Sequence, residues 1–233
     1  MLKMYSMPFL KSLIFSLLKG RTLIIKGHSV NKDAILRTMD LLRVFVPGQD
    51  LDELVLPWVE KDQKQRYGVK LSDLCKYKMI GVDCTWVLPK NVKKHATIWS
   101  WQSRTMCCSV YTGTLLDNIV NPKKRWPNDV AFRAYLHQHL LRFSMDACYY
   151  FYEFCLQPTE MGSFKGLEKV KGSDMMGKQA DQLKLQFQRR HSLHEQDLEI
   201  IEYLTETVKM HLCGVRSGHL RLDYSASKKI SCV

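Results

Sequence analysis

Apolar residues recur every three or four positions near the start of the chain, between residues 9 and 18, and Lys11 and Lys19 fall beside this stripe. Lys11 interrupts the apolar run and no small-residue cleavage site follows, which argues against a signal peptide. The run is also shorter than the roughly 20 residues that a bilayer-spanning helix needs. We therefore expect an amphipathic helix that covers one face of a sheet, and no transmembrane segment.

Residues 20–48 predict a strand, a turn and a helix. Thr22–Ile25 is a short apolar run closed by Gly27, which is typical of a strand covered on both faces. Asn31 then offers an N-cap, and apolar residues follow with helical spacing until Pro47 ends the helix. The apolar positions of this helix are Ala34, Ile35, Thr38, Leu41, Leu42 and Phe45. The three elements form half of a βαβ unit, whose second strand must come from elsewhere in the chain.

The next part of the chain, up to residue 120, mixes apolar runs with short helical patterns, so we expect an α/β region with a central sheet and flanking helices. Pro57 marks its first extended segment as an edge strand. The predicted elements are an edge strand within Leu51–Val59, a short helix at Leu71–Tyr77 capped by Ser72, a buried strand at Met79–Val82, a basic loop at Lys90–His95 and an alternating strand at Thr97–Trp101.

A basic, proline-flanked segment at residues 121–127 separates this region from a helical one. We place a boundary there, between an α/β part (1–120) and an all-α part (121–233). Asn128 can cap a long helix that carries an aromatic stripe, and the width of this stripe predicts burial against more than one neighbour. The positions of the stripe are Phe132, Leu136, His139, Leu140, Phe143, Ala147, Tyr150, Phe151 and Phe154.

Two further helices follow a Gly- and Lys-rich loop at 162–172. Ser173 can cap the first helix, which ends in a basic turn that suits the helix dipole. Ser192–Glu195 has the S-x-x-E pattern of a capping box and opens the second helix, for which Gly214 is the expected stop. Leu220–Tyr224 predicts a short docking strand.

The formal charge of the 233 residues is +12, with a pI near 9.3. A positive field favours nucleic acid, an anionic membrane or an acidic protein partner. The basic residues are dispersed, however, and solvated loops explain most of them. The candidate contacts for an anion or an acidic partner are Lys123, Lys124, Arg125, Arg189 and Arg190. A basic nucleic-acid-binding module therefore remains an alternative function.

The sequence contains no pattern that predicts a metal, a nucleotide or another cofactor. Its eight cysteines form no C-x-x-C pair, and we expect reduced cysteines that behave as small hydrophobes rather than a disulfide framework. An enzyme with a cysteine nucleophile, for example at Cys107 or Cys108, stays open because neighbours in space are invisible. The acidic residues are scattered, and those at 195, 197, 199 and 202 predict the solvated face of a helix.

Six short motifs, taken in their order along the chain, resemble the C-terminal DENN region of the folliculin family. They are Leu18–Ile25, Val44–Gly48, Lys78–Gly81, Cys108–Leu115, Glu202–Glu206 and Leu220–Tyr224. The resemblance implies a DENN-like fold, in which a central α/β part precedes a helical part. It also implies regulation of small GTPases of the Rab, Rag or Arf kind, as an exchange factor or within a GTPase-activating complex that acts in autophagy and in lysosomal and TOR signalling.

The resemblance implies partners as well. Family members form heterodimers with a second longin–DENN protein, beside a WD-repeat protein, in the cytoplasm, at lysosomes or partly in the nucleus. Their arginine finger belongs to a longin half that this sequence does not match. An arginine supplied to a transferring phosphoryl group is worth roughly 10³–10⁵ in rate. We therefore expect a non-catalytic scaffold, in which Arg21 anchors the fold.

Overall fold

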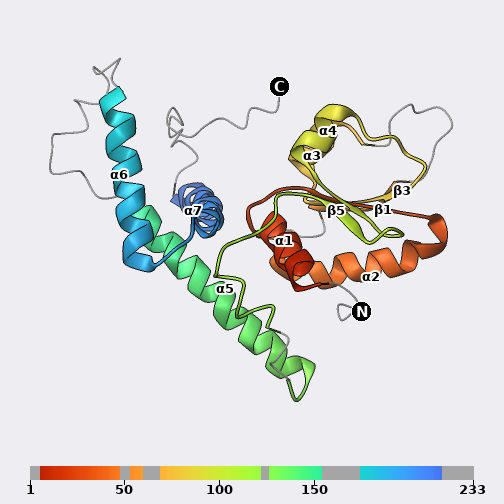
Figure 1. Ribbon diagram of the computed structural model, residues 1–233, viewed down its shortest axis with the longest axis horizontal. Coiled ribbons are helices and arrows are strands. Elements are labelled where there is room, and N and C mark those ends of the chain that lie inside the picture. Colours follow the sequence, from red (N-terminus) through yellow and green to blue (C-terminus); the bar gives the residue numbers. More distant parts are fainter. Residues whose placement is uncertain (1–5, 48–52, 60–68, 122–125, 154–173, 217–233) are drawn as a thin grey trace. The chain divides into compact units, whose positions relative to one another are not determined.

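The computed structural model describes residues 6–47, 53–59, 69–121, 126–153 and 174–216 (Figure 1). The chain divides into two compact units, Met1–Tyr111 with Cys213–Val233 and Thr112–Leu212. The first unit carries a mixed sheet with flanking helices, and the described part of the second unit carries helices. The predicted loop at 162–172, the tail motif at 220–224 and the proposed cap Ser173 lie outside the described residues.

The sheet of the first unit has five strands in the order β2-β3-β1-β4-β5. The strands are β1 (Leu23–Gly27), β2 (Val55–Val59), β3 (Met79–Asp83), β4 (Thr97–Ser100) and β5 (Thr105–Cys107). All neighbouring pairs are parallel except β4 with β5. The predicted buried strands are confirmed: β1 lies between β3 and β4, and its apolar residues Leu23, Ile24 and Ile25 are fully buried. The segment that contains Pro57 is an edge strand, as predicted.

Helices cover both faces of this sheet. α1 (Met7–Leu18) and α2 (Lys32–Leu42) lie on one face, and α3 (Leu71–Lys76) and α4 (Lys90–His95) on the other (Figure 1). Short 3₁₀ turns at Ser29–Asn31 and Arg43–Phe45 flank α2. One apolar core gathers residues of β1, β3, α3, α4 and the segments that connect them, namely Ile24, Val69, Leu74, Ile80, Val82, Trp86, Leu88, Val92 and Ala96. Burial of this core holds the short helices against the sheet.

The basic segment Lys90–His95 is the helix α4, so the predicted loop was wrong. Two tertiary contacts explain it. Val92 is fully buried in the core, and Arg21 donates from Nη2 to the carbonyl oxygens of Lys94 at 2.8 Å and Ala96 at 3.1 Å. These bonds satisfy carbonyl groups at the carboxyl end of the helix, which a six-residue helix could not do alone. The expected anchoring role of Arg21 is confirmed.

The predicted cap of α3 was also wrong. Ser72 lies inside α3, and the N-cap position belongs to Lys70. Asp73 provides the capping contact instead, since its Oδ2 accepts a hydrogen bond from the backbone N–H of Lys70 at 2.7 Å. A carboxylate in the first turn satisfies a free amide and suits the helix dipole, so the acidic residue replaces the serine.

The buried face of α2 is mostly the predicted one. Ile35, Thr38 and Leu42 are buried as predicted, whereas Leu41 is 58% exposed and Met39 is buried in addition. Asn31 occupies the N-cap position but its side chain makes no capping hydrogen bond. The spacing 35, 38, 39 and 42 gives the stripe that is buried.

Helix α1 is confirmed, but its second half is buried more completely than an amphipathic stripe predicts. Ser12 and Ser16 are both buried and hydrogen-bonded. Thr97 Oγ1 donates to Ser16 Oγ at 3.0 Å, and the backbone N–H of Tyr111 donates to Ser12 Oγ at 3.0 Å. Gly20, with φ of 75°, then ends the helix in the left-handed conformation that glycine tolerates best.

The second unit contains α5 (Asp129–Phe151), α6 (Asp174–His191) and most of α7 (Glu195–Arg216). Asn128 caps α5 as predicted, because its Oδ1 accepts from the backbone N–H of Ala131 at 2.8 Å. Two other boundaries were wrong. Ser192 has φ of 52° and lies outside α7, and Gly214 lies within α7 rather than ending it.

Candidate docking face on helix α5

Helix α5 has a buried face that holds the helical unit together. Five of the nine predicted stripe positions are buried, namely Leu136, Phe143, Ala147, Tyr150 and Phe151. Phe132, His139 and Leu140 are half-buried, and Phe154 lies outside the described residues. The width of the stripe is explained by two neighbours, α6 and α7. Burying large aromatic side chains of this kind contributes the dominant favourable term to the stability of a helical bundle.

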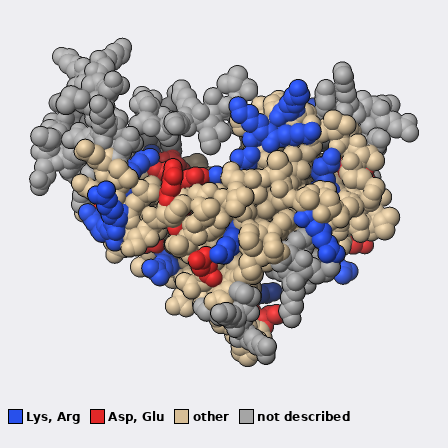
Figure 2. All heavy atoms as spheres, in the orientation of Figure 1, with Lys and Arg blue, Asp and Glu red and all other residues tan. Residues whose placement is uncertain are grey.

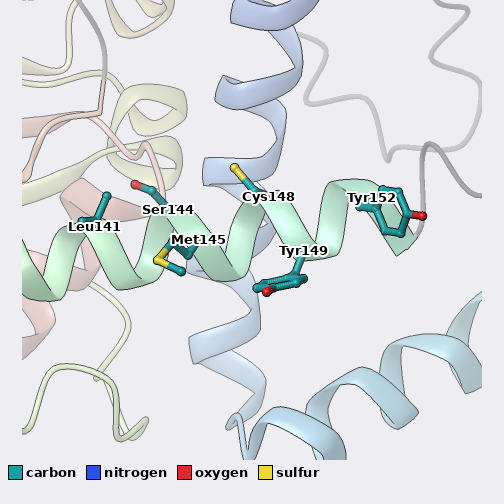
Figure 3. Close-up of a pocket in the computed structure, with 6 residues that line it drawn as sticks. All are labelled: Leu141, Ser144, Met145, Cys148, Tyr149 and Tyr152. Atoms are coloured by element: carbon teal, nitrogen blue, oxygen red, sulfur yellow. The ribbon is translucent and has the colours of Figure 1, made fainter.

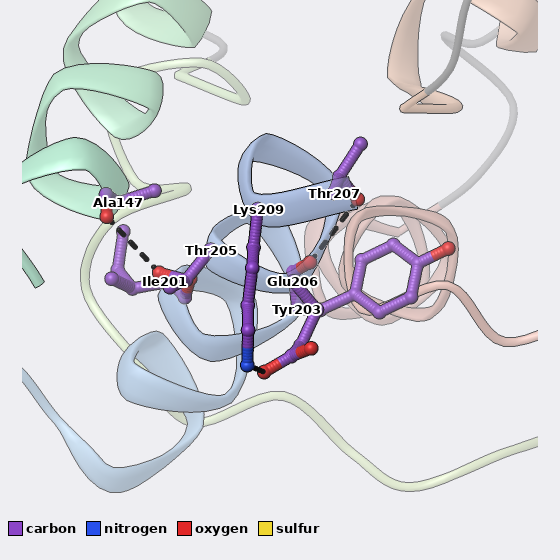
Figure 4. Close-up of polar contacts among 7 residues, drawn as sticks. All are labelled: Ala147, Ile201, Tyr203, Thr205, Glu206, Thr207 and Lys209. Atoms are coloured by element: carbon purple, nitrogen blue, oxygen red, sulfur yellow. Dashed lines mark hydrogen bonds and ion pairs between the residues drawn. The ribbon is translucent and has the colours of Figure 1, made fainter. Parts of the chain in front are cut away.

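Thr205 of α7 makes a buried polar contact with the backbone of α5. Its Oγ1 lies 3.1 Å from the carbonyl oxygen of Ala147 and 2.8 Å from that of Ile201, so the hydroxyl proton is shared between the two acceptors (Figure 4). Ala147 is fully buried. A small residue at this position lets α7 approach the backbone of α5, and the threonine belongs to the Glu202–Glu206 motif.

Helix α6 contacts α5 through its last turn. Phe187 packs edge-on against Tyr150 with ring centroids 5.0 Å apart, and stacks on His191 at 4.2 Å. His191 Nδ1 lies 4.0 Å from Asp146 Oδ1. Burial raises the pKa of Asp146, and the charges of His191 and Arg142 offset part of this rise.

A second apolar face of α5 is exposed. Leu141, Met145, Tyr149 and Tyr152 are 63%, 53%, 57% and 54% exposed. Together with Ser144 and Cys148 they follow one another along the helix and line an open depression of about 420 Å³ (Figure 3). The spacing of three and four residues places all six on one side of the helix. The sequence analysis predicted only the buried stripe and missed this second face, the outer face of α5.

The charges beside this outer face are mixed. Arg142 is exposed and stands on α5 at about 90° round the helix from the middle of the stripe. Glu153 stands on the same side and pairs with Arg190. Arg133 stands on the other side but eight residues before Leu141, so it precedes the face and does not border it. An apolar face with a cation at one edge is suited to an amphipathic partner helix that carries an acidic residue at the matching edge.

A buried carboxylate anchors the start of α7. Asp197 is fully buried and its Oδ2 accepts from Thr114 N at 3.0 Å, Thr114 Oγ1 at 3.3 Å and His194 N at 3.1 Å. Its Oδ1 accepts from the backbone N–H of Leu115 at 3.3 Å. The prediction that Asp197 lies on a solvated face was wrong, because the helix terminus and the 112–115 loop need an acceptor there.

The predicted anion contacts are only partly described. Lys123, Lys124 and Arg125 lie outside the described residues. Arg190 pairs through Nη1 with Glu153 Oε1, whereas Arg189 is exposed. In the view of Figure 2, the Lys and Arg side chains stand in several separate groups. Arg189 and Arg190 are therefore the two predicted contacts whose surroundings the structure describes.

Among the described residues, no group of three or more His, Cys, Asp or Glu side chains could hold a metal ion. None of the helices in the described ranges has the length and apolar character required to cross a membrane. Among the described cysteines, Cys84, Cys107, Cys108 and Cys148 are free, whereas Cys75 is disulfide-bonded, which the expectation of reduced cysteines did not foresee.

Comparison with known proteins identifies a family over most of the chain. The family model for the C-terminal domain of guanine nucleotide exchange protein SMCR8 matches residues 1–205. Guanine nucleotide exchange protein SMCR8 of Mus musculus is 24% identical over 234 residues, and that of Homo sapiens 25% identical over 234 residues; each match covers 94% of this chain and 23% of the relative.

A fish relative agrees with the mammalian ones. Guanine nucleotide exchange protein smcr8b of Danio rerio is 24% identical over 242 residues, a match that covers 96% of this chain and 21% of the relative. The chain therefore spans less than a quarter of the length of the curated relatives it matches.

Proposed function

Because the chain belongs to the family of the C-terminal domain of guanine nucleotide exchange protein SMCR8, we propose that it is a partner-binding, non-catalytic part of a small-GTPase regulator. The relatives are named as guanine nucleotide exchange proteins, which supports regulation of a GTPase by this family. The chain corresponds to under a quarter of their length. Its contribution is therefore one of assembly with the rest of the regulator.

The proposed fold is DENN-like. A five-stranded mixed sheet with helices on both faces and a separate helical unit support it. In this proposal the α/β unit forms the central DENN part and the Thr112–Leu212 unit forms the helical part. This order of an α/β part and a helical part is the one that the resemblance of the six sequence motifs implies.

The single observation that carries the binding role is the exposed apolar face of α5. Four large apolar side chains, each more than half exposed, stand in a row on a helix whose opposite face is buried. Large contiguous apolar surface is typical of a binding site rather than of free surface. The proposed occupant is a helix of a second longin–DENN protein, with apolar residues along its centre and an acidic residue at the edge that faces Arg142.

In this proposal neither Arg21 nor Arg190 is an arginine finger. Arg21 donates to two carbonyl oxygens at the end of α4, and Arg190 pairs with Glu153. The GTPase is of the Rab, Rag or Arf kind, and the assembly includes a WD-repeat protein. It acts in autophagy and in lysosomal and TOR signalling, in the cytoplasm, at lysosomes or partly in the nucleus.

A calorimetric titration of the chain with purified longin–DENN proteins tests the proposal. Tyr149→Asp places a charge in the centre of the outer face and should weaken binding by at least about tenfold, because central aromatic residues dominate the energy of such interfaces. Val30→Asp is the matched control, since Val30 is 92% exposed on the other unit. The binding role is refuted if no such protein binds, or if both variants bind as tightly as the unchanged chain.

A further inference from the structure

The connections that leave β1 and β3 diverge at one edge of the sheet. These two strands are parallel neighbours, and Gly27 at the end of β1 pairs with Asp83 at the end of β3. The chain then runs from β1 to α2 on one face and from β3 to α4 on the other (Figure 1). In open α/β sheets, functional residues gather where neighbouring strands send their connections in opposite directions.

The residues that follow the two strands form a cysteine–histidine pair. The backbone N–H of Cys84 donates to the carbonyl oxygen of Gly27 at 2.8 Å, which places Cys84 beside His28. The Sγ atom of Cys84 lies 2.9 Å from Nδ1 of His28 and 3.6 Å from Nε2. Cys84 is free and half-buried, and His28 is exposed. A thiol with an imidazole nitrogen at this distance can pass its proton to the ring.

Lys26 brings a positive charge close to the pair. Lys26 donates from Nζ to the carbonyl oxygen of Trp86 at 2.8 Å. Burial lowers the pKa of Lys26, as does the charge of Lys93, whereas Cys84 and Asp83 act in the opposite direction. The ammonium group of Lys26 therefore interacts favourably with a negative sulfur at Cys84, and an electropositive, partly open setting is what activates a thiol.

The acidic neighbour of the pair is Asp83. Asp83 Oδ1 accepts from the backbone N–H of Thr85 at 2.9 Å and from its hydroxyl at 2.7 Å. The carboxylate is thereby engaged with the turn that follows β3. His28 Nδ1 keeps its short contact with the sulfur.

The other free cysteines that the structure describes lack this setting. Burial and the neighbouring Cys107 raise the pKa of Cys108, which favours its protonated form. Cys107 and Cys148 are exposed, and no histidine contact is recorded for either among the described residues. Cys107 and Cys148 therefore serve as reference cysteines, which are more exposed to solvent than Cys84 and have no histidine contact among the described residues.

We propose that Cys84 is an activated thiol with His28 as its base, and that this pair is a site of covalent modification by small electrophiles, of which a peroxide is the biological class. His28 takes the thiol proton, and the thiolate sulfur attacks one peroxide oxygen to form an S–O bond. The O–O bond breaks, and the leaving hydroxide takes the proton from the imidazolium to give water. Sulfur loses two electrons to the peroxide, and the product is a sulfenic acid.

Competitive alkylation of the folded chain with iodoacetamide, followed by mass spectrometry of each cysteine peptide, tests the pairing. At pH 7, Cys84 should react at least about tenfold faster than Cys107, because His28 lies 2.9 Å from its sulfur and can take the thiol proton. His28→Gln keeps a polar side chain but removes the base, so it should slow Cys84 by about the same factor. Cys107 in the same sample reports whether the fold has changed.

A control and a second reagent complete the test. His137→Gln changes an exposed histidine on α5 and should leave the rate at Cys84 unchanged. After brief hydrogen peroxide treatment, a sulfenic-acid probe such as dimedone should label Cys84 before Cys107. The proposal is overturned if Cys84 reacts no faster than Cys107, or if its rate is the same in the His28→Gln variant.

Discussion

At the scale of single residues, Asp197 alone accepts the hydrogen bonds that join the 112–115 loop to the start of α7. Its two oxygens accept four hydrogen bonds, from a hydroxyl and three backbone N–H groups, in a fully buried position. Two of the amides belong to the 112–115 loop and one to the start of α7. A carboxylate is suited to this place because it only accepts, and because it lies at the positive end of a helix dipole.

Asp197→Ala should lower the free energy of unfolding by about 3 kcal/mol, since it leaves buried amides without an acceptor. The measurement is chemical denaturation followed by circular dichroism. Glu195→Ala is the control, because it removes the same charge from the same helical turn at an exposed position. A loss of equal size in the control would mean that charge near the dipole, and not hydrogen bonding, is responsible.

Gly81 illustrates why a family motif contains a glycine. A Cβ atom at this position would lie 2.3 Å from the carbonyl oxygen of Pro57 and 3.2 Å from Cε3 of Trp58. Gly81→Ala should therefore push β2 away from β3 and cost about 2 kcal/mol in the free energy of unfolding. The change can be followed by thermal or urea denaturation.

Gly27→Ala is the comparison for that experiment. Its Cβ would lie 2.3 Å from Cδ1 of Ile35, the far end of a flexible side chain. The side chain can turn away, and alanine lowers the entropy of the unfolded chain, so the net cost should stay below about 1 kcal/mol. Equal losses in the two variants would contradict the role given to the backbone of β2.

At the scale of elements, the apolar pattern predicts most helices and strands because their buried faces have clear periods. It fails where a distant part of the chain decides the outcome. Lys90–His95 is polar enough to suggest a loop, and becomes a helix because Val92 is buried and Arg21 closes its end. Gly214 suggests a stop, yet α7 continues to Arg216.

The contact between α5 and α6 predicts a pH dependence. Burial raises the pKa of Asp146 above its ordinary value, and His191 and Arg142 counteract this only in part. A carboxyl whose pKa is higher in the folded than in the unfolded state favours folding when protonated, and this contribution is lost as the pH rises through the folded-state pKa. At neutral pH the ionised group therefore weakens the folded state.

Asp146→Asn should consequently raise the free energy of unfolding at pH 7 relative to the unchanged chain. The difference should shrink as the pH falls through the raised pKa of the folded state, and it should vanish below the ordinary carboxyl pKa, where Asp146 is protonated in both states. Urea denaturation at several pH values measures it, with Asp129→Asn as an exposed carboxylate on the same helix. A lower stability of Asp146→Asn at pH 7 would indicate that the contact with His191 outweighs burial.

At the scale of the whole molecule, the sequence predicts an α/β region before a helical one, and the described elements follow that order. The strand order could not be predicted, because nothing in β1 specifies that β3 and β4 flank it. The outer face of α5 could not be predicted from the sequence either. Leu141, Met145, Tyr149 and Tyr152 fall between the members of the buried stripe, and only the structure separates the two faces.

Hydroxyl-radical footprinting of the complex with a longin–DENN partner tests the central claim most directly, because it reads side-chain access without changing the chain. Met145, Tyr149 and Tyr152 should be oxidised readily in the free chain and protected several-fold in the complex, whereas Met210, 62% exposed on α7, should react equally in both. Protection elsewhere with unchanged oxidation of Met145 and Tyr149 would show that the outer face of α5 is not the docking surface.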